Sequence, residues 1–274
     1  MLSRTELFRR LGVSSIVIAV VIGLISLAHV SWFQFLVAAV VAGLSAIAVW
    51  EYDQFAKAKG GQMIFPALVV LTVCEVLSFF AVSLGASTSL PSVVFFIGFL
   101  VMFALHFRQK DGAVVDLAVS AFGLLYIAVP VGMFLGILYL PSVDGRWWLG
   151  YLLVVTKITD IGAYFGGSLW GKRKLAPTIS PKKTVEGAVC GLVCALAASF
   201  VCSPVLGLSF AEWFFLGLIL GIVGQFGDLS ESLLKRDANK KDSNALPGLG
   251  GVLDALDSLL FNAPIVYFYL QYIR

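Results

Sequence analysis

Long apolar runs separated by short polar segments make up most of the chain. Each run approaches the roughly 20 residues that an α-helix needs to cross a bilayer. Because lipid offers the backbone no hydrogen-bonding partner, runs of this length are expected to be helices. The predicted spans are residues 11–30, 33–50, 63–84, 91–107, 114–140, 147–169, 187–207, 211–234 and 252–273. The pattern predicts an all-α, polytopic integral membrane protein with about nine transmembrane helices.

The run 114–140 contains Pro130, so it could form one kinked helix or two short helices. The placement of basic residues favours one helix. With nine spans and a cytoplasmic N-terminus, most of the 19 Lys and Arg residues fall on the cytoplasmic side: Arg4, Arg9, Arg10, Lys57, Lys59, Arg108, Lys110, Lys172, Arg173, Lys174, Lys182, Lys183, Lys235, Arg236, Lys240 and Lys241. Only Arg146 and Arg274 fall outside, and Lys157 lies within a span.

This asymmetry follows the positive-inside rule. It predicts a protein of the cell (inner) membrane whose long polar segments, about 170–186 and 235–251, both face the cytoplasm. Composition agrees, because only 13% of the residues are charged whereas soluble domains average about a quarter. A net charge of +3 is too small to indicate a nucleic-acid partner. We expect one transmembrane domain over 1–274, with N-terminal helices in 1–110.

Acidic residues near the C-terminal end form the first group that could carry chemistry. Asp254 and Asp257 are three residues apart, as are Asp228 and Glu231, so each pair shares one helix face. One or two carboxylates plus phosphate oxygens are the ligands that Mg²⁺ prefers. Two alternatives remain. The first pair could simply stabilise a helix N-terminus, and the second pair could form an internal ion pair with Lys235, which shares its helix face.

The second group lies in 156–187, between and within predicted spans. Lys157 and Asp160 are about one helical turn apart, and closely spaced glycines and five cationic residues follow. Lys182 and Lys183, together with exposed backbone amides, suit a polyphosphate or an anionic head group. The alternative is a basic loop that rests on anionic lipid. We expect the active site in the helices and cytoplasmic loops of 147–274.

At these residues the chain resembles the phosphatidate cytidylyltransferases (CDP-diacylglycerol synthases). The C-terminal signature of that family is S-x-x-K-R-x-x-x-x-K-D, a spacer, and P-x-H-G-G-x-x-D-R-x-D. It is matched here at Ser232, Lys235, Arg236, Lys241, Asp242, Pro247, Gly250, Gly251, Asp254 and Asp257. The segment DIGAYFGG and the segment KRKLAPTISPKKTVEG also resemble an upstream stretch of the family.

The chain departs from the family pattern at four places. Leu249 replaces a His and Ala255 an Arg, Lys157 stands where the upstream stretch usually has Trp, and the spacer between Asp242 and Pro247 is one residue shorter. Lys157 is one group that could substitute for the missing His or Arg.

The resemblance implies transfer of the cytidylyl group of CTP to phosphatidate, which gives CDP-diacylglycerol and pyrophosphate for phospholipid synthesis. It implies a Mg²⁺ cofactor held by Asp228, Asp254 and Asp257, with Glu231 as a further candidate. The expected catalytic residues are Asp228, Asp254, Asp257 and Lys235, and the expected substrate-binding residues are Asp160, Lys182, Lys183, Ser232, Arg236 and Lys241.

CTP, phosphatidate and membrane lipid are the expected partners, and a homodimer is left open. Two other functions remain alternatives at this point. One is a CTP-dependent kinase of polyprenol or another lipid alcohol. The other is an ion-coupled transporter with Asp228, Glu75 and Lys157 along its path.

Overall fold

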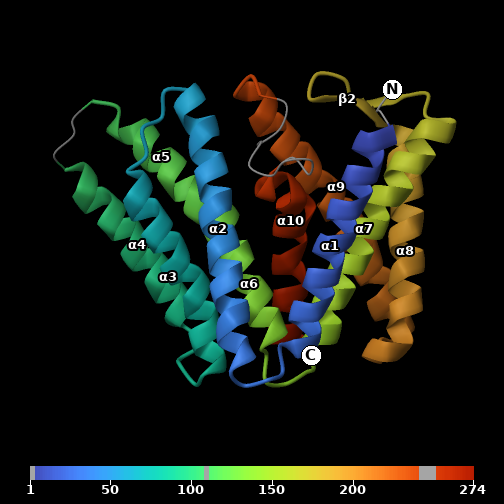
Figure 1. Cartoon of the computed structure of the whole chain (residues 1–274), viewed down its shortest axis with the longest axis horizontal. Helices are drawn as coiled ribbons and strands as arrows, with labels where there is room; N and C mark the ends of the chain where they lie inside the picture. The colour runs from blue at the N-terminus through green and yellow to red at the C-terminus, as the bar shows by residue number, and fades with distance from the viewer. Residues whose placement is uncertain (1–3, 108–110, 241–250) are drawn as a thin grey trace. The chain divides into compact units, whose positions relative to one another are not determined.

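The computed structural model describes residues 4–107, 111–240 and 251–274, and most of these form helices (Figure 1). The helical elements in chain order are α1 (Arg4–Leu27), α2 (Phe33–Ala58), α3 (Phe65–Ser83), α4 (Leu90–His106), α5 (Ala113–Gly123), η1 (Leu124–Ala128), α6 (Val129–Leu138), α7 (Gly145–Trp170), α8 (Val185–Leu206), α9 (Phe210–Asp237) and α10 (Val252–Tyr272). Between α7 and α8, β1 (Lys174–Ala176) and β2 (Ser180–Thr184) form an antiparallel hairpin. The predicted all-α class is confirmed, with this small hairpin as an addition to it.

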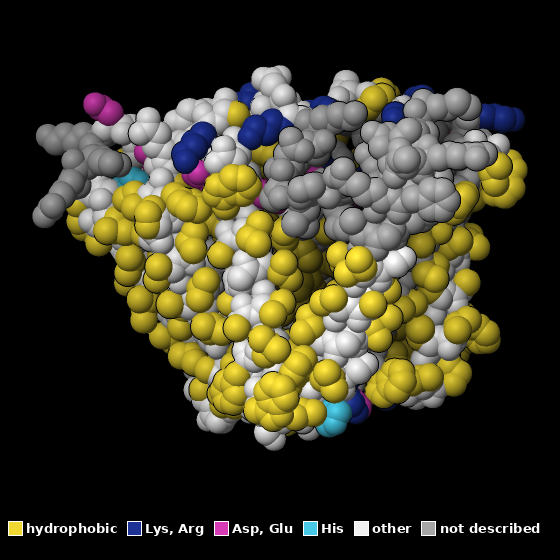
Figure 2. All heavy atoms as spheres, in the orientation of Figure 1, with side chains coloured by type: hydrophobic (Ala, Val, Ile, Leu, Met, Phe, Trp, Pro, Cys, Tyr) yellow, Lys and Arg dark blue, Asp and Glu magenta, His cyan; other side chains and the backbone are white. Residues whose placement is uncertain are grey.

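Within the described ranges, six helical segments are long and apolar enough to cross a membrane. They are Phe33–Ala58, Phe65–Ser83, Ala113–Leu138, Val185–Leu206, Phe210–Asp237 and Val252–Tyr272. Two further apolar stretches, Ser15–Leu27 and Leu90–His106, are shorter. Figure 2 shows hydrophobic side chains over most of the visible helix surface and Lys and Arg side chains near helix ends. These features are those of a polytopic membrane protein.

The run around Pro130 forms one helical path, as the distribution of basic residues predicted. α5 passes into η1, a π-helical turn, and α6 begins directly after it with Pro130 in its first turn. Proline lacks the N–H that an α-helical hydrogen bond needs, and its ring crowds the preceding turn. The π-helical turn already shifts the hydrogen-bond ladder at this point. The helix therefore accommodates the proline without splitting into two spans.

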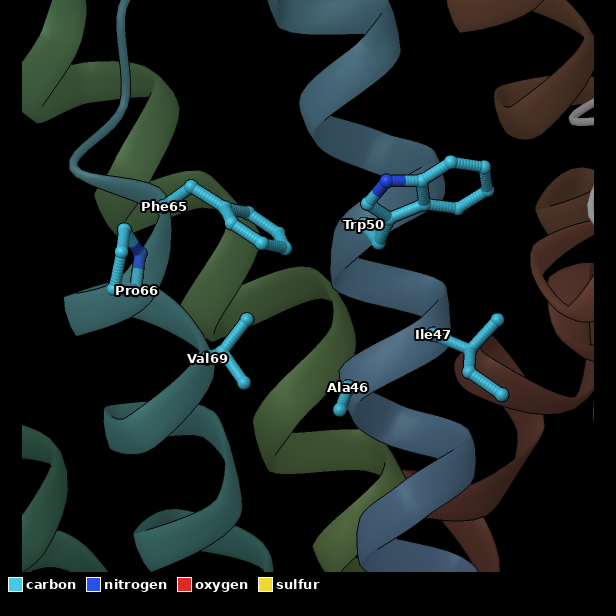
Figure 3. A pocket seen from close by; sticks show the side chains of 6 residues that line it. All are labelled: Ala46, Ile47, Trp50, Phe65, Pro66 and Val69. Carbon is cyan, nitrogen blue, oxygen red and sulfur yellow. The ribbon is translucent and has the colours of Figure 1, made fainter.

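Contacts divide the chain into two compact units, residues 1–141 with 240–255 and residues 142–239 with 256–274. In the first unit, α3 packs against α2, α4 and the path from η1 to α6. An apolar hollow of about 500 Å³ lies between α2 and α3 (Figure 3). Its lining is Ala46, Ile47, Trp50, Phe65, Pro66 and Val69. None of these side chains offers a charged or nucleophilic group. The hollow therefore suits a hydrocarbon chain and is not a candidate catalytic site.

In the second unit, α7 and α8 pack side by side with their backbones close together (Figure 1). A Cβ atom added at Gly162 of α7 would lie 2.5 Å from Sγ and 2.7 Å from Cβ of Cys194 in α8. Small residues at such an interface let transmembrane helices approach closely. Asn262 of α10 donates to Thr156 Oγ1 at 2.9 Å and to the Leu220 carbonyl at 3.1 Å. These bonds tie α10 to both α7 and α9.

Replacing Gly162 by alanine should lower the free energy of unfolding by about 1–3 kcal/mol, because the new methyl group overfills the contact with Cys194. Gly150 is the matched control on the same helix, because a Cβ atom there meets nothing within 4 Å. Gly150→Ala should leave stability unchanged or raise it by up to about 1 kcal/mol through better helix propensity. Thermal unfolding of both variants in detergent is the measurement. Equal effects would contradict the close approach of α7 and α8.

Candidate active site

Asp160 of α7 and Asp257 of α10 meet at one serine of the second unit, and Asp228 of α9 lies near both. The Ser258 hydroxyl donates to Asp257 Oδ1 at 3.1 Å and to Asp160 Oδ1 at 3.5 Å. Asp228 of α9 lies within electrostatic range of both Asp160 on α7 and Asp257 on α10. Asp257 is buried. The structure thus brings together Asp160, Asp228 and Asp257, which the sequence places far apart.

Two lysines lie beside these carboxylates. Lys183 Nζ is 2.6 Å from Asp228 Oδ2, and both side chains are only partly exposed. Lys157 Nζ is 3.5 Å from Asp160 Oδ2. Lys157 is the residue that stands where the resembled family usually has Trp, and here it contributes positive charge to the aspartate cluster. Asp228 therefore has Lys183 as its ion-pair partner.

A hollow of about 530 Å³ opens beside this cluster, within the second unit. Its lining residues are Asp160, Ala163, Tyr164, Gly167, Ser168, Lys174, Leu175, Lys182, Lys183, Thr184, Gly187, Ala188, Gln225 and Asp228. Three lysines therefore line the same space as two carboxylates. A ligand with several phosphates suits such a space, because its charge can meet the lysines while a cation bridges it to the carboxylates.

The hairpin β1–β2 carries the three lysines, and hydrogen bonds hold its base. Glu186 Oε2 accepts from the Lys172 backbone N–H at 2.9 Å and from that of Arg173 at 3.1 Å. Thr184 accepts from the Gly187 N–H at 3.1 Å and so caps the N-terminus of α8. Arg236 of α9 donates from Nε to the Ile179 carbonyl at 3.2 Å. The polar segment between α7 and α8 is thus an ordered part of the site.

The other expected site residues on α9 lie beyond Asp228. Glu231 is fully buried and forms an ion pair with Lys235. Ser232 is half-buried on the same helix. Arg236 binds the hairpin turn through the bond given above, which places an expected substrate-binding cation beside the lysines. The internal ion pair with Lys235 that the sequence left open as an alternative is formed, and its acidic partner is Glu231 rather than Asp228.

Of the remaining expected residues, one lies in the first unit and one lies outside the described residues. Asp254 is in the first turn of α10, within the first unit, and its Oδ2 accepts from the Gly251 N–H at 2.9 Å. Asp257 follows three residues later on the same helix. Lys241, expected to bind substrate, lies outside the described residues.

Sequence reasoning overlooked several groups at this site. Ser258 directly follows Asp257, and Gln225 precedes Asp228 by three residues and so shares its helix face. Lys174, in the basic segment before the hairpin turn, was not distinguished from its neighbours. Adjacency to an acidic residue was the available signal for the first two residues. For Lys174, only strand pairing decides that it faces the hollow.

The carboxylates of the site fit a magnesium ion whose remaining ligands come from the substrate. In the part of the chain that the structure describes, no three Asp, Glu, His or Cys side chains converge into a complete metal cage. Mg²⁺ seldom uses such a cage and instead combines one or two carboxylates with phosphate oxygens and water. Asp228 lines the hollow and Asp257 lies near Asp228, and both side chains are hard oxygen donors of the required kind.

Comparison with known proteins covers nearly the whole chain. Residues 9–273 match the model of the cytidylyltransferase family. A phosphatidate cytidylyltransferase of Chlamydia pneumoniae is 35% identical over 97% of this chain and 92% of its own length. That of Synechocystis sp. is 34% identical over 80% of this chain and 83% of its own. That of Bacillus subtilis is 48% identical over 129 residues, which cover 46% of this chain and 48% of its own.

Replacing Lys235 by methionine should lower the free energy of unfolding by about 3 kcal/mol, because it removes the ion-pair partner of the buried Glu231 carboxylate. The double variant Lys235→Met, Glu231→Gln should recover most of this loss, since the buried charge is then removed as well. Denaturant titration of the purified protein measures both. A double variant less stable than Lys235→Met would contradict the pairing.

Proposed function

The chain belongs to the cytidylyltransferase family, and on this premise we propose that it transfers the cytidylyl group of CTP to phosphatidate. The products are CDP-diacylglycerol and pyrophosphate. The observation that carries the proposal is the hollow of the second unit, where Lys174, Lys182 and Lys183 line the same space as Asp160 and Asp228. Relatives that match most of the chain bear the name phosphatidate cytidylyltransferase.

The reaction joins two anions, so the site must first overcome their repulsion. We propose that Lys182 and Lys183 hold phosphates of the two substrates, with Arg236 and Ser232 adding contacts from α9. A phosphatidate oxygen then attacks the α-phosphorus of CTP in line with the departing pyrophosphate. One P–O bond forms as the other breaks, and no covalent enzyme intermediate is needed.

Asp228 and Asp257 are the residues that we propose to hold Mg²⁺, with Asp254 as the third proposed ligand on the helix of Asp257. When bound, the ion supplies neutralisation of the charge that develops on the leaving pyrophosphate. Asp160 orients the site through Ser258 and Lys157, both of which contact its carboxylate. Lys235, expected from the sequence to be catalytic, forms an ion pair with the buried Glu231, and its proposed part is to hold the neighbouring turn of α9 that carries Ser232 and Arg236.

We propose that the chain crosses the cell (inner) membrane nine times and that its active site faces the cytoplasm. In addition to the six helical segments that are long and apolar enough to cross a membrane, α1, α4 and α7 complete the nine proposed spans. The placement of sixteen Lys and Arg residues on one side and two on the other, as given above, supports this orientation.

Purified protein supplied with CTP, phosphatidate and Mg²⁺ should form CDP-diacylglycerol, and Asp257→Asn should reduce kcat by at least about 100-fold, since one carboxylate of the charge-stabilising site is lost. Product detected by mass spectrometry is the measurement. Asp237→Asn is the matched control on α9, because Asp237 is exposed at the end of that helix and should leave kcat within about twofold of wild type. Full turnover by Asp257→Asn would remove it from the proposed site.

The same preparation separates the other functions. A polyprenol kinase would phosphorylate a lipid alcohol and leave phosphatidate unchanged. A transporter would move ions across liposomes without consuming CTP. Either result, with no CDP-diacylglycerol formed, would overturn the proposal.

Metal binding can be measured apart from turnover, with Mn²⁺ as a paramagnetic substitute for Mg²⁺. Asp228→Asn and Asp257→Asn should each weaken Mn²⁺ binding by about tenfold or more in electron paramagnetic resonance titrations with CTP present. Asp237→Asn should bind Mn²⁺ as the wild type does. Wild-type affinity in all three variants would place the ion elsewhere.

A further inference from the structure

One buried glutamate far from the signature residues contacts the helix that carries two of them. Glu51 of α2 is fully buried. Its Oε1 accepts from the Val252 backbone N–H at 2.9 Å, and its Oε2 accepts from the Leu253 backbone N–H at 2.7 Å. All three residues belong to the first unit. Both carboxylate oxygens of Glu51 are therefore used on the start of α10, 201 residues further along the chain.

This contact supplies hydrogen-bond acceptors for backbone N–H groups at the N-terminus of α10. The first N–H groups of a helix have no partner within it, and a side chain just before the helix usually accepts from one of them. Here the residue before α10 is Gly251, which has no side chain. Asp254 accepts from the Gly251 N–H, and Glu51 accepts from the next two. The negative charge of Glu51 also complements the positive end of the helix dipole.

A second residue of α2, Phe55, one helical turn after Glu51, contacts Lys240. Lys240 Nζ lies 5.7 Å from the ring centre of Phe55, within cation–π range. Glu51 and Phe55 are four residues apart and thus share one face of α2. The same helix face therefore meets the chain just after α9 ends and again where α10 begins.

We propose that Glu51 is a positioning residue: its carboxylate fixes the first turn of α10 and thereby the setting of Asp254 and, one turn later, of Asp257. This rests on the proposed function, in which these aspartates hold the metal ion. Glu51 touches neither substrate nor metal. Its effect passes through two backbone N–H groups, so its removal alters metal affinity and turnover of protein that is still folded. A purely structural residue would instead change only the yield of folded protein.

Glu51→Gln tests this directly. The amide keeps the shape of the side chain but places an N–H₂ group against a backbone donor. We expect kcat per folded enzyme and Mn²⁺ affinity to fall about tenfold, the effect usual for residues that orient metal ligands. Glu75→Gln is the matched control: Glu75 is a buried glutamate of α3 in the same unit, and its variant should keep both values. Glu51→Gln with wild-type kcat and Mn²⁺ affinity would overturn the proposal.

A second pair of variants removes the contact from the other side and does not alter Glu51. Proline is favoured at the first position of a helix and lacks the N–H, so Val252→Pro removes one donor to Glu51 while permitting the helix. Val252→Ala keeps that N–H and serves as its control. We expect Val252→Pro to weaken Mn²⁺ binding at least about threefold relative to Val252→Ala, part of the tenfold effect above. Equal affinities in the two would contradict the positioning role even if Glu51→Gln fails to fold.

The outcomes separate this inference from the proposed function. Wild-type protein that makes no CDP-diacylglycerol would overturn the proposed function. An active wild type whose Glu51→Gln and Val252→Pro variants match their controls would overturn only the role of Glu51.

Discussion

Carboxylates brought together among apolar helices repel one another, and their charge is costly unless positive groups or hydrogen-bond donors lie beside them. The second unit meets this constraint with a small number of contacts. Lys183 pairs with Asp228, Lys157 lies near Asp160, and Ser258 donates to both Asp160 and Asp257. Lys183 is on the hairpin and Asp228 is on α9, so their ion pair also attaches the hairpin to α9. The same arrangement leaves lysines lining a hollow beside the carboxylates, which is the environment that a nucleoside triphosphate and a lipid phosphate require.

The membrane helices were largely predictable, because a helix that crosses lipid needs a minimum length and an apolar composition, and both can be read from the sequence. The path through Pro130 was predictable from the distribution of Lys and Arg, although not its π-helical turn, which depends on local packing. The hairpin was read only as a polar loop. Its strands have three and five residues, too few for an alternating pattern, and they exist because they pair with each other and because Glu186 and Arg236 hold their ends.

The site was predictable where residues are close in sequence and unpredictable where helices bring them together. Helical spacing correctly placed Glu231 and Lys235 on one face, but it could not decide whether Asp228 or Glu231 takes the lysine. In the structure, Lys183 of the hairpin pairs with Asp228, and Lys235 pairs with Glu231. Glu51 has no local feature that marks it, since its partners are more than 200 residues away. Lys157 looked like a departure from the family pattern, and in the structure it supplies charge to the aspartate cluster.

The central claim is that these carboxylates and lysines transfer the cytidylyl group, and not the terminal phosphate, of CTP to a lipid. The fate of each phosphorus atom tests it most directly. CTP labelled at the α-phosphorus, and separately CTP labelled at the γ-phosphorus, would be incubated with the purified protein, phosphatidate and Mg²⁺, and the lipid extracted. The account predicts α-label in the lipid and γ-label in aqueous pyrophosphate. Label from the γ-phosphorus in the lipid, or no label from either, would contradict it.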